Sequence, residues 1–240
     1  MKTQRLVDAA VGILPTAHIA TRRRHLRRPV FLGSLRRTTP LSDRWGFDRG
    51  TPIDRVYIER FLGSHRQDIR GRVLEVKDST YMDRFGGDVT ATDILDLDGE
   101  NKRATIVADL GEPSSVEPET FDCFILTQTL QYVDDLDCAI ENARSLLRPG
   151  GVLLATVPGI TRSAGGPNEL PDLWRFTAAG CATLFGRTFE RDAFEVTSYG
   201  NVLSAIAFIT GMAQEELKPA ELEPNDYRFP VILAVRAVRL

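Results

Sequence analysis

Two acidic residues, each set in a short apolar segment, are the clearest candidates for ligand binding in this chain. Glu75 interrupts the apolar run Val73–Val76, and a carboxylate in such a strand needs a partner because burial penalises its charge. Asp93 ends a second β-branched segment eighteen residues later. This is the spacing at which an α/β nucleotide fold places the carboxylate that binds a ribose. Glu75 and Asp93 together therefore predict an adenosine site.

The elements that must position these acids alternate between helix and strand from residue 50 to the end of the chain. Apolar residues at helical spacing predict helices over Pro52–His65 and Leu136–Leu147, and the stop signal Arg148-Pro149-Gly150-Gly151 closes the second helix. Short apolar runs predict strands over Arg72–Val76, Val89–Thr92, Thr105–Leu110, Phe121–Thr127, Val152–Val157, Phe194–Tyr199 and Val231–Val238. We expect a single doubly wound α/β sheet.

Composition is that of a water-soluble protein with one sizeable core. The chain has 240 residues, of which 42% are hydrophobic and 26% are charged. No run approaches the roughly 20 apolar residues that span a bilayer. Its three cysteines, Cys123, Cys138 and Cys181, are odd in number and lack metal-ligand spacing. We therefore expect a cytoplasmic protein with no disulfide and no metal.

The charge is divided unevenly along the chain. Residues 1–49 hold eleven Lys and Arg against three Asp and Glu, a balance of +8, which leaves −11 of the net charge of −3 for the remainder. We expect a helical basic arm over residues 1–49 and one catalytic domain over residues 50–240. The arginines could bind phosphates, anionic lipid or an acidic protein, or serve a homodimer; the alternative is a solvated helix face. The absence of a nucleic-acid motif argues against a nucleic-acid partner.

Three blocks of sequence resemble the class I S-adenosylmethionine-dependent methyltransferases, in particular those with small-molecule acceptors. They are Phe121–Asp135, which reads FDCFILTQTLQYVDD, Leu146–Pro158, which reads LLRPGGVLLATVP, and Trp174–Thr177. The resemblance covers roughly residues 68 to 240. It implies a Rossmann-like sheet of seven strands with the last strand antiparallel, and S-adenosylmethionine as cofactor.

The resemblance also implies roles for individual residues around the cofactor. Glu75 matches the acid that ends the first strand, and Asp93, followed by Ile94, matches the acid that binds both ribose hydroxyls. A carboxylate suits this task because its two oxygens accept from a vicinal diol at once. The adenine edge would meet Asp109 and Leu110, and the methionine part would meet Thr127 and Gln128.

The chain departs from the family in the loop after the first strand. Lys77, Ser79 and Tyr81 stand where the family has three glycines. Lys and Tyr resist a positive φ at a cost of about 1 kcal/mol or more. One reading is a loop that takes another path, with Lys77, Asp78 and Ser79 contacting the amino-acid end of the cofactor. The other is a site that has changed its purpose, to a reaction such as a cyclisation or to noncatalytic partner binding.

A lid is expected before the first strand, over residues 50–67 and the aromatic and charged residues that precede them. Arg49, Asp54, Arg55 and Tyr57 would hold the carboxylate or ammonium of the cofactor, or contact the acceptor. An aromatic ring, Tyr57 or Tyr81, would face the sulfonium through a cation–π contact. The alternative is a self-contained helix cap with surface charges.

The acceptor side has no obvious base. Related enzymes often carry a His-His pair where this chain has Gln131-Tyr132, and Gln131 cannot take a proton. For a hydroxyl acceptor the candidate catalytic residues are Tyr132 and Asp172, with Asp54, His18 and His25 as further candidates. Gln131, Trp174 and Arg175 are expected to contact the acceptor, although core packing and a surface ion pair explain the last two equally well. We expect methylation of a small or glycosidic molecule, with O-methylation slightly ahead of N-methylation.

Overall fold

The computed structural model describes residues 31–113, 116–164 and 170–240. The chain divides into two compact units, Met1–Thr38 and Thr39–Leu240. In the first unit the described residues form one short 3-10 turn, η1 (Gly33–Leu35). The arginine cluster at residues 22–28, His18 and His25 lie outside the described residues, so the predicted helical arm stays a prediction.

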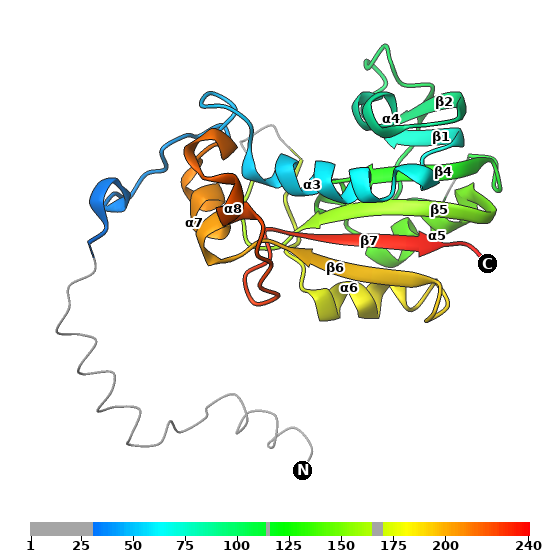
Figure 1. Cartoon of the computed structure of the whole chain (residues 1–240). Coiled ribbons are helices and arrows are strands. Elements are labelled where there is room, and N and C mark those ends of the chain that lie inside the picture. Colours follow the sequence, from blue (N-terminus) through cyan, green and yellow to red (C-terminus); the bar gives the residue numbers. More distant parts are fainter. Residues whose placement is uncertain (1–30, 114–115, 165–169) are drawn as a thin grey trace. The chain divides into compact units, whose positions relative to one another are not determined.

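The second unit is built on one sheet of seven strands in the order β3-β2-β1-β4-β5-β7-β6 (Figure 1). The first five strands are parallel, and β7 runs antiparallel to both of its neighbours. The predicted sheet of seven strands, with the last strand of the chain antiparallel, is therefore confirmed. The strands are β1 (Gly71–Val76), β2 (Val89–Asp96), β3 (Ile106–Val107), β4 (Phe121–Thr127), β5 (Leu147–Pro158), β6 (Phe194–Tyr199) and β7 (Ile232–Val238).

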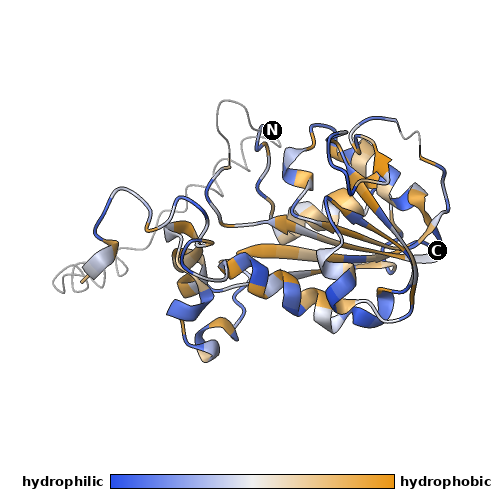
Figure 2. Ribbon diagram, turned by 90° about the horizontal axis from the view of Figure 1, so that it is seen from above, coloured by the Kyte–Doolittle hydropathy of each residue, from blue (hydrophilic) through white to orange (hydrophobic). Residues whose placement is uncertain are grey.

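Helices cover both faces of the sheet, as expected for a doubly wound fold. Because side chains alternate along a strand, Phe124 of β4 packs with α5 (Leu136–Leu146) and α6 (Ala178–Phe185) on one face. Ile125 packs with α3 (Ile53–Ser64), α4 (Thr80–Phe85) and α7 (Val202–Thr210) on the other. Figure 2 shows the apolar strands enclosed by helices whose outer faces are polar. A short helix, α8 (Pro219–Leu222), precedes β7.

The strand predicted over Thr105–Leu110 is shortened to Ile106–Val107. Three other elements also differ from the sequence-based prediction. Strand β2 continues to Asp96, beyond Thr92, because Ile94 and Leu95 are buried. Strand β5 begins at Leu147 rather than Val152, because Leu147 follows α5 directly in an extended conformation, with φ −76° and ψ 145°. The third is α4, which occupies the end of the stretch that was expected to be a ligand loop.

No helix in residues 31–113, 116–164 or 170–240 is long and apolar enough to cross a membrane. Within the same residues no group of three or more His, Cys, Asp or Glu side chains is placed to hold a metal ion.

Candidate functional site

The candidate site lies where the strand order reverses, between β1 and β4. The chain passes from β1 outward to β2 and β3 and then returns to β4 on the other side, and such a switch point opens a crevice at the carboxyl ends of the strands. Lys77 and Gln128, which directly follow β1 and β4, have left-handed φ values of +75° and +47°. Non-glycine residues rarely adopt this conformation, and it is typical of strained functional loops.

Lys77 occupies the first of the three positions at which the family has glycine. Its backbone N–H donates to the carbonyl of Leu95 at 2.8 Å, and its own carbonyl accepts from Asn101 Nδ2 at 2.9 Å. These two hydrogen bonds hold Lys77 in the left-handed conformation, although its Cβ disfavours a positive φ. The loop therefore makes a left-handed turn at this position without a glycine there, and the Lys77 side chain is exposed.

Glu75 holds the start of α4. Its side chain is 2% exposed, and its two oxygens accept from the amides of Tyr81 at 2.9 Å and Met82 at 2.7 Å. Burial raises the pKa of Glu75 to about 7, although both amide bonds oppose that shift. The partner that this buried acid requires is thus the backbone of its own loop.

Asp78 and Ser79 also bond within this loop. Asp78 accepts from the amide of Thr80 at 2.9 Å, and Ser79 Oγ donates to Asp83 at 2.7 Å. Burial raises the pKa of Asp78, but bonds from Thr80 and the charges of Arg103 and Arg55 outweigh it and leave that pKa lowered. Asp78 is therefore an anion at neutral pH.

Asp93, the predicted ribose ligand, lies inside the sheet rather than at its edge. It pairs in register with Leu74, three residues before β2 ends. Its Oδ2 accepts from Arg72 Nε at 2.7 Å and its Oδ1 from the Thr105 hydroxyl at 2.9 Å. Both oxygens are thus engaged within the protein.

The acid at the carboxyl end of β2 is Asp96, which the sequence analysis missed. Its Oδ2 accepts from Asn101 Nδ2 at 2.6 Å, and the same amide group donates to the Lys77 carbonyl, so Asn101 joins the ends of β1 and β2. The place of Asp96 at the strand end follows from the register of the sheet, in which Val76, the last residue of β1, pairs with Leu95. A carboxylate beside the switch point is the group that a ribose site requires.

The predicted adenine-edge residues follow β3, next to Asp96. The amide of Ala108 donates to the Asp96 carbonyl at 3.1 Å, which places the two strand ends side by side. Asp109 is exposed and accepts from the amide of Gly111 at 2.8 Å. Leu110 is buried, and Asn142 donates to its carbonyl at 2.8 Å. Ile94 is buried within β2.

The expected lid brings Arg55 against the loop after β1. The Arg55 guanidinium lies 6.0 Å from the Phe47 ring centroid and 5.9 Å from that of Tyr81, and its Nη1 donates to the Tyr81 hydroxyl. Asp54 Oδ1 is buried without a hydrogen-bond partner, and burial raises the pKa of Asp54. Two of the predicted lid residues therefore face Tyr81, at the third glycine position.

The other two predicted lid residues lie elsewhere. Tyr57 is fully buried on α3, 6.1 Å from the Tyr199 ring centroid, so its ring packs in the core and does not face a cofactor. Arg49 Nε donates to Glu216 at 2.9 Å in an ion pair that joins residues 49–52 to the segment before α8. Its guanidinium is thus engaged with a carboxylate of the same domain.

The turn after β4 holds the predicted acceptor residues. Thr127 pairs with Thr156 at the end of β4, and the Gln128 amide donates to the Thr156 carbonyl at 2.8 Å. Gln131, in the 3-10 turn η3 (Leu130–Tyr132), is 5% exposed, and its Nε2 donates to the Gln128 carbonyl at 2.9 Å. Its Oε1 is buried and has no partner. Tyr132 is half-buried beside it.

Asp172, one of the predicted bases, is fully engaged. Its two oxygens accept from Arg175 at 2.5 and 2.6 Å, and Oδ2 also accepts from the amide of Ala164 at 2.6 Å. Burial acts to raise the pKa of Asp172, but these bonds prevail and lower it. An anion held in this way is a poor proton acceptor, so the structure gives Asp172 a positioning role instead of a catalytic one.

Trp174 is anchored on the turn after β4. Its indole Nε1 donates to the Val133 carbonyl at 2.8 Å, and its ring stays partly exposed. Trp174 and Arg175 line an open groove with residues of α6. The predicted acceptor residues Gln131, Trp174 and Arg175 thus lie along neighbouring turns.

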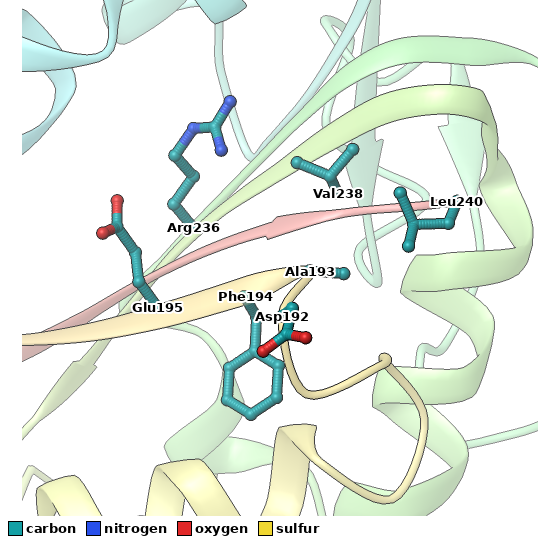
Figure 3. A pocket seen from close by; sticks show the side chains of 7 residues that line it. All are labelled: Asp192, Ala193, Phe194, Glu195, Arg236, Val238 and Leu240. Carbon is teal, nitrogen blue, oxygen red and sulfur yellow. The ribbon is translucent and has the colours of Figure 1, made fainter.

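A second hollow lies at the opposite edge of the sheet, near the amino end of β6 (Figure 3). Arg236 and Glu195 project from the same side of β7 and β6 there, and Phe194 projects from the other. Arg236 is bound to Asp68 at 2.8 and 3.0 Å. None of the predicted site residues lines this hollow.

Comparison with known proteins agrees with this architecture. Residues 73–155 match the family model described as a methyltransferase domain. An S-adenosylmethionine-dependent methyltransferase from Mesorhizobium loti superposes with a TM-score of 0.51 at 15% identity, over 81% of this chain and 100% of that one. Another from Archaeoglobus fulgidus gives a TM-score of 0.50 at 13% identity, over 77% of this chain and 94% of that one. No curated protein matches the chain.

Likeness at such identities is a likeness of fold, and here it coincides with the family match over β1 to β5. Residues 73–155 thus match a methyltransferase domain, and the sheet has the fold of S-adenosylmethionine-dependent methyltransferases. The cofactor of this class is S-adenosylmethionine.

Proposed function

We propose that this protein transfers the methyl group of S-adenosylmethionine to a small-molecule acceptor at the switch point between β1 and β4. The observation that carries the proposal is the placement of Asp96 at the end of β2, joined through Asn101 to the left-handed turn at Lys77. This arrangement sets a carboxylate beside a backbone turn at the edge where α/β folds bind nucleosides.

Asp96, in place of Asp93, is proposed to bind the ribose. Both oxygens of Asp93 accept hydrogen bonds, from Arg72 and Thr105, in the interior of the sheet, where the Asp93 side chain is 13% exposed. Asp96 accepts from the side chain of Asn101 and the amide of Asp98, both of which a ribose diol can replace. Asp109 and the backbone of Leu110 are proposed for the adenine edge, as the resemblance implies.

The amino-acid end of the cofactor is proposed to lie between the lid and the turn after β4. Asp54 Oδ1 is a buried acceptor without a partner, and such an atom is costly unless a ligand supplies a donor. An α-ammonium group has three N–H donors and fits Asp54, while Arg55 offers its guanidinium to the carboxylate. The residues present thus fit the group that the family implies.

The residues around this site would act mainly by alignment. The bound cofactor supplies a methyl group already activated by a positive sulfur. The lid and the turns after β4 and β5 would hold the acceptor in line and exclude water. Tyr132 remains the candidate base for a hydroxyl acceptor, since Arg175 occupies Asp172. Because a candidate base for a hydroxyl acceptor is present, we keep O-methylation slightly ahead of N-methylation.

A cyclisation or a noncatalytic role was the alternative reading of the missing glycines. The left-handed conformation of Lys77 supports retention of the methyltransferase loop without them. We therefore do not propose a second function.

Isothermal titration of the full chain with S-adenosylhomocysteine tests the proposal. We expect micromolar binding, and the same for S-adenosylmethionine. The absence of binding at millimolar ligand would contradict the proposed function.

A further inference from the structure

Four buried polar atoms on the acceptor side of the site have no hydrogen-bond partner. They are Gln131 Oε1, Thr161 Oγ1, Arg162 Nε and Arg175 Nε, which we call the unpaired cluster. Seven side-chain atoms of this kind occur among the described residues, so more than half belong to the turns that follow β4 and β5. Buried polar atoms are almost always paired, and an unpaired group marks a place where a ligand is missing.

Hydrogen bonds to backbone carbonyls connect the segments that carry the unpaired cluster. The amide of Leu173 donates to the Gln131 carbonyl at 2.8 Å, and Arg175 Nη2 donates to the Arg162 carbonyl at 2.7 Å. Thr161 is next to Arg162 in the chain. Gln131 is 5% exposed, so a ligand can contact it only from the interior side of these segments.

The charges of the unpaired cluster cancel. Arg175 is bound by both oxygens of Asp172, at 2.5 and 2.6 Å. Arg162 faces Asp43, with Nη1 and Oδ1 3.7 Å apart, and its guanidinium stacks on Trp45 at 3.9 Å from the ring centroid. Two cations are thus balanced by two anions, and no surplus charge is left to attract an anionic ligand.

The unpaired atoms are of both hydrogen-bonding types. The two Nε atoms are donors, Gln131 Oε1 is an acceptor, and the Thr161 hydroxyl is both. A phosphate or carboxylate would satisfy the donors and leave Gln131 Oε1 unpaired, whereas an apolar ligand would satisfy none of the four. Hydroxyl groups donate and accept, so several hydroxyls on one ligand pair with all four atoms.

We infer that the unpaired cluster binds a neutral acceptor carrying several hydroxyl groups, such as a sugar ring, and that Gln131 accepts from one of these hydroxyls. The inference rests on the proposed function, because the cluster borders the site at which the methyl group would be delivered. Gln131 and Arg162 then determine specificity for the acceptor.

Saturation-transfer NMR on the full chain with S-adenosylhomocysteine tests this inference. The probes are methyl α-glucopyranoside and myo-inositol, compared with glucose 6-phosphate, glucuronate and cyclohexanol. We expect both neutral polyols to bind at least about tenfold more tightly than the anions and cyclohexanol, since each unpaired polar group in a site weakens binding by such a factor.

Two variants locate that binding. Gln131→Met removes the acceptor atom at similar length, and Arg162→Lys removes the Nε donor but keeps the charge. Each is expected to weaken polyol binding about tenfold. Arg148→Lys, in an exposed pair with Asp122 at the start of β5, is the matched control and should leave binding unchanged. Circular dichroism and S-adenosylhomocysteine affinity confirm that each variant is folded.

The outcomes separate this inference from the proposed function. Binding of S-adenosylhomocysteine without a preference for polyols would overturn the inference and leave the proposed function standing, as would full polyol affinity in both variants. If the unmodified chain does not bind S-adenosylhomocysteine, the proposed function is overturned, and the inference with it.

Discussion

Arg72 of β1 and Asp93 of β2 form an ion pair across neighbouring strands, with Nε and Oδ2 2.7 Å apart. The Asp93 side chain is 13% exposed, and the Arg72 guanidinium lies over the Phe121 ring at 5.3 Å from its centroid. The pair and its contact with Phe121 therefore link β1, β2 and β4 within the sheet, before the carboxyl ends of the strands. This position makes Asp93 a structural residue.

Replacement of Asp93 by alanine is expected to lower the free energy of unfolding by about 1–3 kcal/mol, because it leaves Arg72 and the Thr105 hydroxyl without an acceptor. Urea unfolding measures the change. Asp96→Ala is the matched control, and it should cost less because Asp96 accepts from exposed groups near the strand end. Equal stability of the Asp93 variant and the unmodified chain would contradict this role.

Lys77→Gly is expected to raise the free energy of unfolding by about 0.5 kcal/mol. Glycine removes a left-handed strain of about 1–2 kcal/mol, and the greater freedom of the unfolded chain offsets about 0.4–1 kcal/mol of that gain. Lys102→Gly, at an exposed turn residue without a positive φ, should instead lower stability. If both variants lose stability alike, Lys77 is not strained.

Glu75 predicts a pH dependence of stability. Its pKa is about 7 in the folded chain and 4.5 as the ordinary value, so the folded state holds a proton that the unfolded state releases between these pH values. The stabilisation is full below pH 4.5 and is lost as the pH rises through 7. Relative to Glu75→Gln, the unmodified chain should lose on the order of 2 kcal/mol over this window. Urea unfolding at several pH values would show parallel profiles if Glu75 did not titrate there.

Asp172 predicts the opposite dependence. Its pKa is lowered in the folded chain, so its contribution is present above the ordinary value of 3.8 and is lost as the pH falls through the folded value. Asp172→Asn should cost about 2 kcal/mol at pH 7, because the amide lacks the negative charge and the second acceptor oxygen that pair with Arg175. Thermal unfolding should show a smaller difference near pH 2. A difference that is independent of pH would argue against the ion pair.

The sheet was predictable from the sequence because its strands are apolar runs separated by clear turn signals. Phe121–Thr127 and the block that ends in Gly150-Gly151 identify β4 and β5, and the resemblance supplies the number of strands and the antiparallel direction of the last. The end of β2 was not predictable, since the run from Val89 to Asp96 holds two acids and its length depends on pairing with β1. This is why the sequence analysis assigned the ribose carboxylate to Asp93, whereas we propose Asp96.

Contacts between segments that lie far apart in the sequence also could not be predicted from the sequence. Tyr57 was assigned to the cofactor because its residue type suits a sulfonium, yet its place on α3 turns it toward Tyr199. Asp172 was assigned as a base without knowledge that Arg175 binds both of its oxygens. The assignment of Gln131 to the acceptor stays a prediction, and its unpaired Oε1 is a property of the folded structure alone.

The central claim is that Asp96, and not Asp93, binds the ribose of the cofactor. Isothermal titration of S-adenosylhomocysteine into the unmodified chain, Asp96→Ala and Asp93→Ala tests it most directly. We expect affinity to fall about a hundredfold in Asp96→Ala, which loses two charge-assisted hydrogen bonds, and to stay within about twofold in Asp93→Ala. A large loss in Asp93→Ala with full affinity in Asp96→Ala would contradict the account.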